Sequence, residues 1–588
     1  MKHATIVISI ALLATLGFAH GSENFEIRGP VVEVVNGVEY VWGPQEFGGF
    51  YYGVNQDLGA ESLQIQIRDG SVEPGDAKYR SEAQDVAFEN EGWGNYRVLV
   101  FLGQKYFAGY GTTQISSACN CLEDGILRQI LIDSADRQTL GSDEDLLLED
   151  GYNIRFSEDE AGVKVSLYKD TRLVDTTIIN PPETYVYAKN VADQDIAILA
   201  VQVVGNVKLK PTSYYTVKGV FQISEEPFRV ESGSEYGLMD ISSAKDDEVV
   251  MTNSQGIEFV AGKDIELIDG IKIKTADQGF VSAEHPLRFY VYKDITEPGT
   301  YEIRSSIAEV VDGMTVEWDI SNFAGFHYDL DDDIGTERII MTITDGALDE
   351  PCGVRYETVA QEDDFALEDW GSFYTIPFMG EEYFAAYVEN GRLYYDSEDT
   401  NLMVDEQLSR MLVNSAEPLT IKSGDVLKLE EGFEAKLFVD DSCEKAFLEL
   451  CRDGNLIEMD YFDVPGTYAY TTNLGESQNV VILALHVAEV NCTGDRTCTV
   501  DGIWQISDTL TDVEEDSEYD KMTIQTVDSV CFYVMMDNED NKITLNRNMD
   551  TSLIGDIKIK TADQDEISAE APLRWYIYEE VIIEDEES

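Results

Sequence analysis

The segment WGPQEFGGFYYGVNQDLGAE at residues 42–61 recurs, with substitutions, as WDISNFAGFHYDLDDDIGTE at residues 318–337. The likeness extends outward from both. Upstream, IRGPVVEVVNGVEYVW (27–42) matches IRSSIAEVVDGMTVEW (303–318), and downstream IKIKTADQ occurs at both 271–278 and 557–564. Each half closes on a related segment, PLRFYVY at 286–292 and PLRWYIY at 572–578. Repetition on this scale predicts two tandem copies of one long unit, joined near Thr296–Gly299.

Both copies show alternating polarity. In SLQIQIRDG (62–70), Leu63, Ile65 and Ile67 alternate with polar residues, and the second copy keeps the pattern at 339–343. Alternation with a period of two places one face of a strand in a core and the other in water. Asp-Gly and Asn-Gly pairs, such as Asp69-Gly70, separate these runs and indicate tight turns. Short strands with regular turns predict antiparallel β-sandwiches.

Each copy is too long for one typical sandwich, so we expect two domains per copy. Polar or acidic segments at 142–151 and 415–425 suggest where each copy divides. The predicted fold is therefore all-β, a tandem repeat of two units, each of two connected antiparallel β-sandwich domains. The expected domains are residues 22–145, 146–298, 299–420 and 421–588, the last with an acidic tail.

The N-terminus has the pattern of a secretory signal peptide. Lys2 and His3 precede an apolar run at 6–18, and small residues follow at Ala19 and Gly21. We therefore expect residues 1–21 to be removed on export. The best later apolar stretch, 196–204, is only strand-sized and contains Gln202, so we expect no direct membrane span.

Acidic residues dominate the composition, since 114 Asp and Glu oppose 41 Lys and Arg for a formal charge of -73. Such a surface repels nucleic acid and anionic lipid, so neither is an expected partner. Two explanations of the charge stay open. It serves solubility or adaptation to salt, or carboxylates line pores and bind divalent ions between subunits.

Eight cysteines suit disulfides outside the cell. Cys443 and Cys451 form one short-range pair, and Cys492 and Cys498 form another across a polar turn. We predict a disulfide within each pair and leave the other four cysteines unassigned. No CxxC motif or Cys/His quartet supports zinc binding.

Histidines provide an internal test for catalysis. By the alignment of the copies, His285, His327 and His486 correspond to Ala571, Tyr51 and Gln202. Because no histidine is kept between copies, a Ser-His-Asp or Cys-His site is poorly supported. Paired carboxylates carry little information in a chain this acidic. We therefore predict a protein that is not an enzyme.

One acidic loop resembles a calcium site. Asp329, Asp331 and Asp333 alternate before Gly335, but this glycine is one place late for an EF-hand and no helices flank the loop. The first copy has Gly53, Asn55 and Asp57 at these positions. A turn after an aromatic strand is the favoured interpretation, with calcium as the alternative hypothesis. No other cofactor is predicted.

Asn491-Cys492-Thr493 is the only N-x-[ST] sequon, and it marks Asn491 as a candidate glycosylation site. A disulfide at Cys492 would hinder this modification.

The repeated pattern WxxxxFxGFxYxxxxDxGxE (42–61 and 318–337), with the later IKIKTADQ and PLR-aromatic segments, resembles the surface-layer (S-layer) proteins of methanogenic archaea of the Methanosarcina type. The likeness covers nearly all of the chain after the signal peptide. It implies two tandem copies of a unit built from two connected β-sandwich domains. It also implies a secreted, self-assembling, porous and negatively charged coat at the cell surface, with further copies or related coat proteins as partners.

Members of that family typically continue into a tether and a C-terminal transmembrane helix, whereas this sequence stops at Ser588. A minor coat component, a released protein or a self-supporting tubular sheath subunit would each fit a missing anchor. We expect any attachment to the cell to be non-covalent or through a partner. The alternative function is a secreted adhesin or carbohydrate-binding protein, which would carry an exposed aromatic patch in one copy only.

Overall fold

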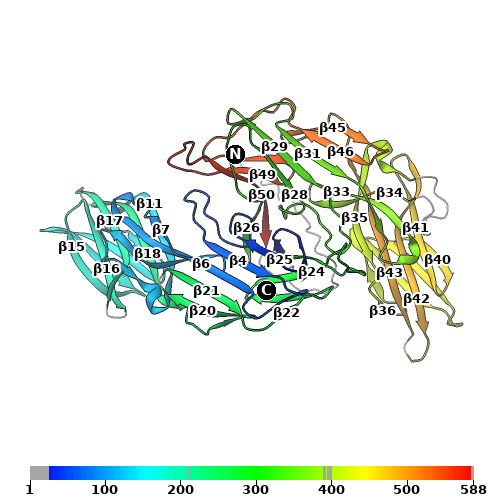
Figure 1. Cartoon of the computed structure of the whole chain (residues 1–588), viewed down its shortest axis with the longest axis horizontal. Helices are drawn as coiled ribbons and strands as arrows, with labels where there is room; N and C mark the ends of the chain where they lie inside the picture. The colour runs from blue at the N-terminus through cyan, green and yellow to red at the C-terminus, as the bar shows by residue number, and fades with distance from the viewer. Residues whose placement is uncertain are drawn as a thin grey trace. The chain divides into compact units, whose positions relative to one another are not determined.

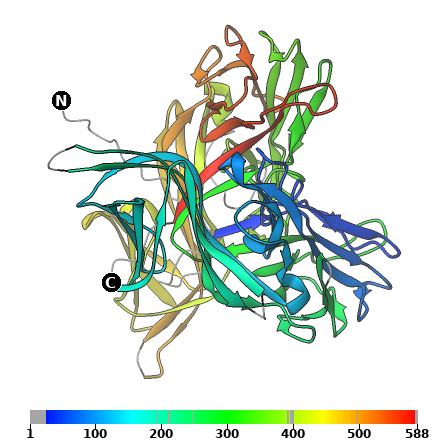
Figure 2. The same cartoon turned by 90° about the vertical axis from the view of Figure 1, so that its left-hand side faces the viewer.

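The computed structural model describes residues 25–191, 194–209, 212–245, 247–388, 393, 400–494 and 496–583 (Figures 1 and 2). The expected signal peptide and the acidic end at 584–588 lie outside the described residues. Across the described ranges the only helical elements are five short 3-10 turns: η1 Glu91–Trp93, η2 Cys121–Asp124, η3 Glu368–Trp370, η4 Leu402–Asp405 and η5 Glu430–Gly432. The all-β prediction is confirmed. None of these helical turns has the length and apolar character needed to cross a bilayer.

The chain forms two compact units that follow the sequence repeat. One contains residues 33–275 and 281–293, and the other contains 294–583 together with 25–32 and 276–280. Strands β1 (Phe25–Arg28) to β25 belong to the first sequence copy, and β26 to β50 belong to the second. The short β2 (Val32–Glu33) follows β1.

The outer sheets of the first copy are built from its two ends. One has the order β19 (Glu235–Tyr236), β20 (Met239–Lys245), β21 (Glu248–Asn253), β6 (Ala77–Glu82), β4 (Glu61–Gln66) and β3 (Glu39–Trp42). Another contains β23 (Asp264–Ile268), β24 (Ile271–Thr275) and β25 (Arg288–Ile295), and β22 (Ile257–Glu258) pairs with β5 (Ser71–Val72).

The central segment of the first copy forms a second pair of sheets. The larger has the order β16 (Glu183–Val191), β17 (Gln194–Val207), β18 (Tyr214–Arg229), β11 (Ile126–Gly141), β9 (Gln104–Thr113), β8 (Gly94–Phe101) and β7 (Gln84–Ala87), with β10 (Cys119–Asn120) on β9. The smaller contains β12 (Asp145–Leu147), β13 (Tyr152–Asp159), β14 (Gly162–Lys169) and β15 (Arg172–Ile179). A shared core joins them, in which Phe156 and Leu167 meet Val201 and Tyr215.

The second copy repeats the outer arrangement. One sheet has the order β44 (Glu518–Tyr519), β45 (Met522–Asp528), β46 (Tyr533–Asp537), β31 (Val354–Val359), β29 (Arg338–Thr344), β30 (Ala347–Leu348) and β47 (Ile543–Thr544), with β28 (Thr315–Asp319) on β29. The other has the order β26 (Gly299–Arg304), β50 (Arg574–Ile583), β49 (Ile557–Thr561) and β48 (Asp550–Ile554), with β27 (Ala308–Glu309) on β50.

The central segment of the second copy also forms one larger and one smaller sheet, as in the first copy. Its larger sheet has the order β32 (Gln361–Asp364), β33 (Ser372–Phe378), β34 (Glu381–Tyr387), β35 (Gln407–Ser415), β43 (Thr497–Asp512), β42 (Ser477–Asn491) and β41 (Gly466–Leu474), with β36 (Leu419–Lys422) on β43. Its smaller sheet contains β37 (Val426–Lys428), β38 (Phe433–Val439), β39 (Lys445–Arg452) and β40 (Asn455–Asp463).

The sheets do not follow the domain boundaries expected at 145/146 and 420/421. β6 pairs with β21, and β31 pairs with β46, so strands from the two ends of each copy share one sheet. The segment between them is an insertion into the outer sandwich rather than its successor. The polar segment at 142–151 holds the turn from β11 to β12, strand β12 itself and the turn to β13, so it is not a linker. Polarity alone does not distinguish these two cases.

The predicted alternation is confirmed by burial. Leu63, Ile65 and Ile67 are completely buried, and so are the corresponding residues at 339, 341 and 343. The repeated tryptophan at the start of the second copy, Trp318, packs edge-on against Trp575 near its end, with ring centroids 5.1 Å apart. The most similar segments of each copy therefore meet in one core.

Candidate functional site

Two of the three aspartates of the candidate calcium loop bind groups within the turn, whereas Asp331 Oδ1 accepts a hydrogen bond from the Asp277 N–H at 2.7 Å. Asp329 Oδ1 accepts hydrogen bonds from the backbone N–H groups of Asp331 and Asp332 at 2.7 and 3.2 Å. Asp333 Oδ1 accepts one from the Tyr328 hydroxyl at 2.7 Å. No group of three or more His, Cys, Asp or Glu side chains suited to a metal ion occurs among the described residues. The bonds of Asp329 and Asp333 support the turn, and calcium binding stays a hypothesis.

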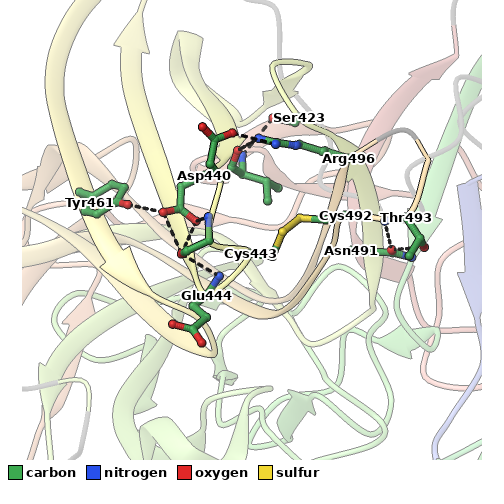
Figure 3. Close-up of a disulfide and its surroundings, with 12 residues drawn as sticks. Ser423, Asp440, Cys443, Glu444, Tyr461, Asn491, Cys492, Thr493 and Arg496 are labelled. Atoms are coloured by element: carbon green, nitrogen blue, oxygen red, sulfur yellow. Dashed lines mark hydrogen bonds and ion pairs between the residues drawn. A yellow bond between two sulfur atoms is a disulfide. The ribbon is translucent and has the colours of Figure 1, made fainter.

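The disulfide prediction was wrong in its pairing. Cys443 is bonded to Cys492 (Figure 3), and their Cα atoms lie 6.2 Å apart. Cys451 and Cys498 are free and buried. A strand advances roughly 3.3 Å per residue, so an extended β39 carries Cys451 far from Cys443. In the hairpin of β42 and β43, Cys498 faces Val490, while Cys492 lies beyond the last strand pair. Spacing in sequence was a poor guide because both short segments are extended.

The disulfide joins the turn between β38 and β39 to the turn between β42 and β43. On the first turn, the Asp440 carboxylate accepts hydrogen bonds from the Ser442 and Tyr461 hydroxyls, and these donors lower the pKa of Asp440 to about 2. On the second, Arg496 donates to the Val439 carbonyl at 3.1 Å (Figure 3). Covalent and polar links thus fasten the small sheet to the large one.

The candidate glycosylation site lies at this disulfide. Asn491 is exposed at the end of β42, and its Oδ1 accepts hydrogen bonds from the Thr493 N–H at 2.8 Å and hydroxyl at 2.6 Å (Figure 3). Glycosylation of Asn491 stays a prediction.

Two buried glutamates, which the sequence analysis did not single out, organise the repeated motif. Glu61 accepts hydrogen bonds from the Tyr79 hydroxyl at 2.7 Å and from the N–H groups of Gly103 and Tyr51 at 2.9 and 3.1 Å. Burial raises the pKa of its carboxyl, and these donors oppose the rise. The recurrence of glutamate at the end of both motif copies was the available signal.

Glu337 makes the same set of bonds in the second copy. It accepts from the Tyr356 hydroxyl at 2.7 Å and from the N–H groups of Gly380 and His327 at 3.0 and 2.9 Å. Each glutamate ties the loop after an aromatic strand to the next hairpin. We call each set of one glutamate, its tyrosine and the two amides a glutamate clamp.

Charges around the two clamps are opposite. In the first copy, Lys293 lies close enough to Glu61 to favour its ionised form, and Lys105 lies over the Tyr51 ring at 5.4 Å. By the alignment of the copies, Glu579 replaces Lys293 and Glu382 replaces Lys105. Asp363 also stands where the first copy has Val86. The second clamp is therefore surrounded by carboxyl groups.

The pKa values of two of these carboxyl groups are raised, which favours their protonated form. Burial, followed by the neighbouring Glu382 and Asp332, raises the pKa of Asp363 to about 8. Burial, followed by Asp556, Glu337 and Glu381, raises the pKa of Glu579 to about 7. His327 lies beside these acidic residues, and its Nε2 atom is 3.9 Å from the Glu382 carboxylate.

Comparison with known proteins places the chain among surface-layer sequences. The profile of a family described as "S-layer protein" matches residues 32–277 and 308–563, one match in each copy. A "Major S-layer protein" of Methanosarcina barkeri is 28% identical over 98% of this chain and 86% of its own length. Proteins of the same description from Methanosarcina mazei and Methanosarcina acetivorans are 28% and 27% identical over 100% of this chain, covering 88% and 89% of their own lengths.

The disulfide gives a stability prediction. Replacing both bonded cysteines (Cys443→Ser/Cys492→Ser) should lower the free energy of unfolding by about 2–4 kcal/mol, because the bond restrains a long loop in the unfolded chain. Denaturant unfolding measures this change. Cys531→Ser, at an exposed free cysteine, is the control and should leave stability almost unchanged. Non-reducing peptide mapping that shows Cys443 joined to Cys451 would contradict the assignment.

The acidic surroundings of the second clamp give a pH prediction. Folded Asp363 and Glu579 have pKa values above their ordinary values, so the folded chain retains protons that the unfolded chain releases. The contribution of these two groups to stability should therefore fall as pH rises from about 4 to about 8. Asp363→Asn should stabilise the protein more at pH 8 than at pH 5 in thermal unfolding. Asp364→Asn, at the exposed neighbour on β32, is the control, and equal effects of the two substitutions would refute the prediction.

Proposed function

This chain belongs to the S-layer protein family, and we propose that its molecules assemble with one another into a porous, negatively charged lattice. It is a secreted structural subunit of a cell-surface layer. One observation carries the proposal: the family match occurs separately in each copy, so one chain supplies two layer modules. Repeated modules offer similar contact surfaces to their neighbours, which suits growth by heterologous contacts.

The build of the modules supports a mechanical role. Long antiparallel ladders, such as β11 with β18 and β42 with β43, run through the large sheets. The Cys443–Cys492 bond and the two glutamate clamps fix loops to these sheets. We propose no catalytic role, because the features kept in both copies are packing and clamp residues.

The charge supports a role as an ion-selective sieve. A formal charge of -73 makes the surface attract cations and repel anions. At physiological ionic strength the screening length is roughly 8 Å, so selectivity requires narrow openings. Cations between acidic subunits would also reduce repulsion as the lattice forms.

Assembly is the direct test of this function. Purified full-length protein at rising concentration, with millimolar calcium or magnesium, should form sheets or tubes visible by electron microscopy. A chelator or acidic pH should change these assemblies, because both alter the carboxylates. A protein that stays monomeric at all concentrations, cation levels and pH values would refute the proposal.

One observation favours the alternative of a carbohydrate-binding protein. Phe438, Phe447 and Tyr461 lie side by side across β38, β39 and β40 on the outward face, and Tyr461 is 49% exposed. In the same cross-strand row the first copy has Ser157, Lys164 and Ile178. The row is therefore an aromatic patch in one copy only.

A glycan array tests this alternative. If the patch binds sugars, the wild-type protein should bind at least one glycan, and Tyr461→Ala should weaken that binding at least tenfold. Ile178→Ala, at the equivalent position of the first copy, should leave it unchanged. An array with no bound glycan would rule the alternative out.

A further inference from the structure

Two equivalent strands leave one edge without a strand partner in the described parts of the chain. β15 pairs only with β14, and β40 pairs only with β39, each at the end of its four-stranded sheet (Figure 1). An edge strand presents a row of backbone N–H and C=O groups that another strand can bind. β15 has 8 residues and β40 has 9, so each edge is roughly 26–30 Å long at 3.3 Å per residue.

Both edge strands expose apolar side chains. Most residues of β15 are exposed, and all residues of β40 except Phe462 are exposed. The exposed large hydrophobic side chains are Leu173, Val174 and Ile178 on β15, and Leu456, Ile457, Met459 and Tyr461 on β40. Exposed edges in soluble proteins ordinarily carry charges or are covered, because apolar edges associate. The edge of a second molecule would cover both the apolar groups and the backbone groups.

The two edges differ in charge. β15 carries Arg172 and Asp175, and the Asp175 carboxylate accepts a hydrogen bond from the Tyr185 hydroxyl at 2.8 Å. β40 carries Glu458, Asp460 and Asp463 and no basic residue. Pairing two β40 strands would oppose like charges, which destabilises a sheet. Pairing β40 with β15 avoids this repulsion and brings Arg172 to an acidic edge.

We propose that β15 of one molecule adds to β40 of a neighbouring molecule, which joins two four-stranded sheets through backbone hydrogen bonds. This inference rests on the proposed lattice function and names the contact that builds it. The contact is heterologous, because it uses a different strand from each partner. Every molecule then offers its β15 edge to one neighbour and its β40 edge to another, so the contact extends from molecule to molecule.

A charge-reversal experiment on the full-length chain tests the contact. Arg172→Glu/Thr177→Glu places two glutamates at exposed positions of β15 opposite the acidic β40. The threshold protein concentration for forming sheets or tubes should be at least tenfold higher for this variant than for the wild type. Circular dichroism and thermal unfolding should match the wild type, since both positions are exposed.

A compensating change should restore assembly. Adding Asn455→Lys/Asp460→Lys makes β40 neutral, so the variant with all four substitutions should assemble near the wild-type concentration. The control is Arg137→Glu/Gln138→Glu, which makes the same change of net charge at exposed positions of β11 that pair with β18 and lie outside the proposed contact. This control should assemble like the wild type.

The outcomes separate this contact from the lattice function itself. If the wild type assembles and the β15 variant assembles equally well, the contact is refuted while the lattice function stands. If the β15 and β11 variants are impaired alike, or the added lysines give no rescue, general repulsion explains the loss and the contact is likewise refuted. If the wild type does not assemble under any condition, both proposals fail.

Discussion

The buried carboxylates of Glu61 and Glu337 hold each copy in its shape. A carboxylate removed from water needs donors, and each of these receives one tyrosine hydroxyl and two backbone N–H groups. The tyrosine hydroxyl in turn accepts a backbone N–H, from Leu102 in one copy and Met379 in the other. Three separate segments of chain must therefore stand in fixed positions for one side chain to be satisfied. This requirement explains why an irregular loop recurs as faithfully as the strands.

Because the clamps are the same, the differences around them are informative. Lys293 near Glu61 favours a charged clamp, whereas Glu579 stands in its place near Glu337. The second copy also carries the disulfide and the outward aromatic row. The copies thus share a framework and differ in charge and in surface. A lattice built from them has two kinds of module in each chain.

The sequence could predict faces and turns but not partners. The alternation at Leu63, Ile65 and Ile67 assigned the buried face, and Asp69-Gly70 adopts the left-handed conformation that such a turn requires. The pairing of β6 with β21 could not be predicted from the sequence, because alternating polarity shows which face of a strand is buried and not which strand lies beside it. The Cys443–Cys492 bond was missed for the same reason. The clamp glutamates were hidden among 114 acidic residues, and only their position in the repeat distinguishes them.

The first and last strands of the second copy are antiparallel neighbours, with Gly299 opposite Ile583 and Arg304 opposite Tyr578. The chain therefore enters and leaves this module at the same end of one ladder. A force that pulls these two points apart would break the hydrogen bonds between β26 and β50 one after another. A force along the strands would load all of them together in shear. A module loaded at these two points would therefore open at a lower force than one loaded along its strands.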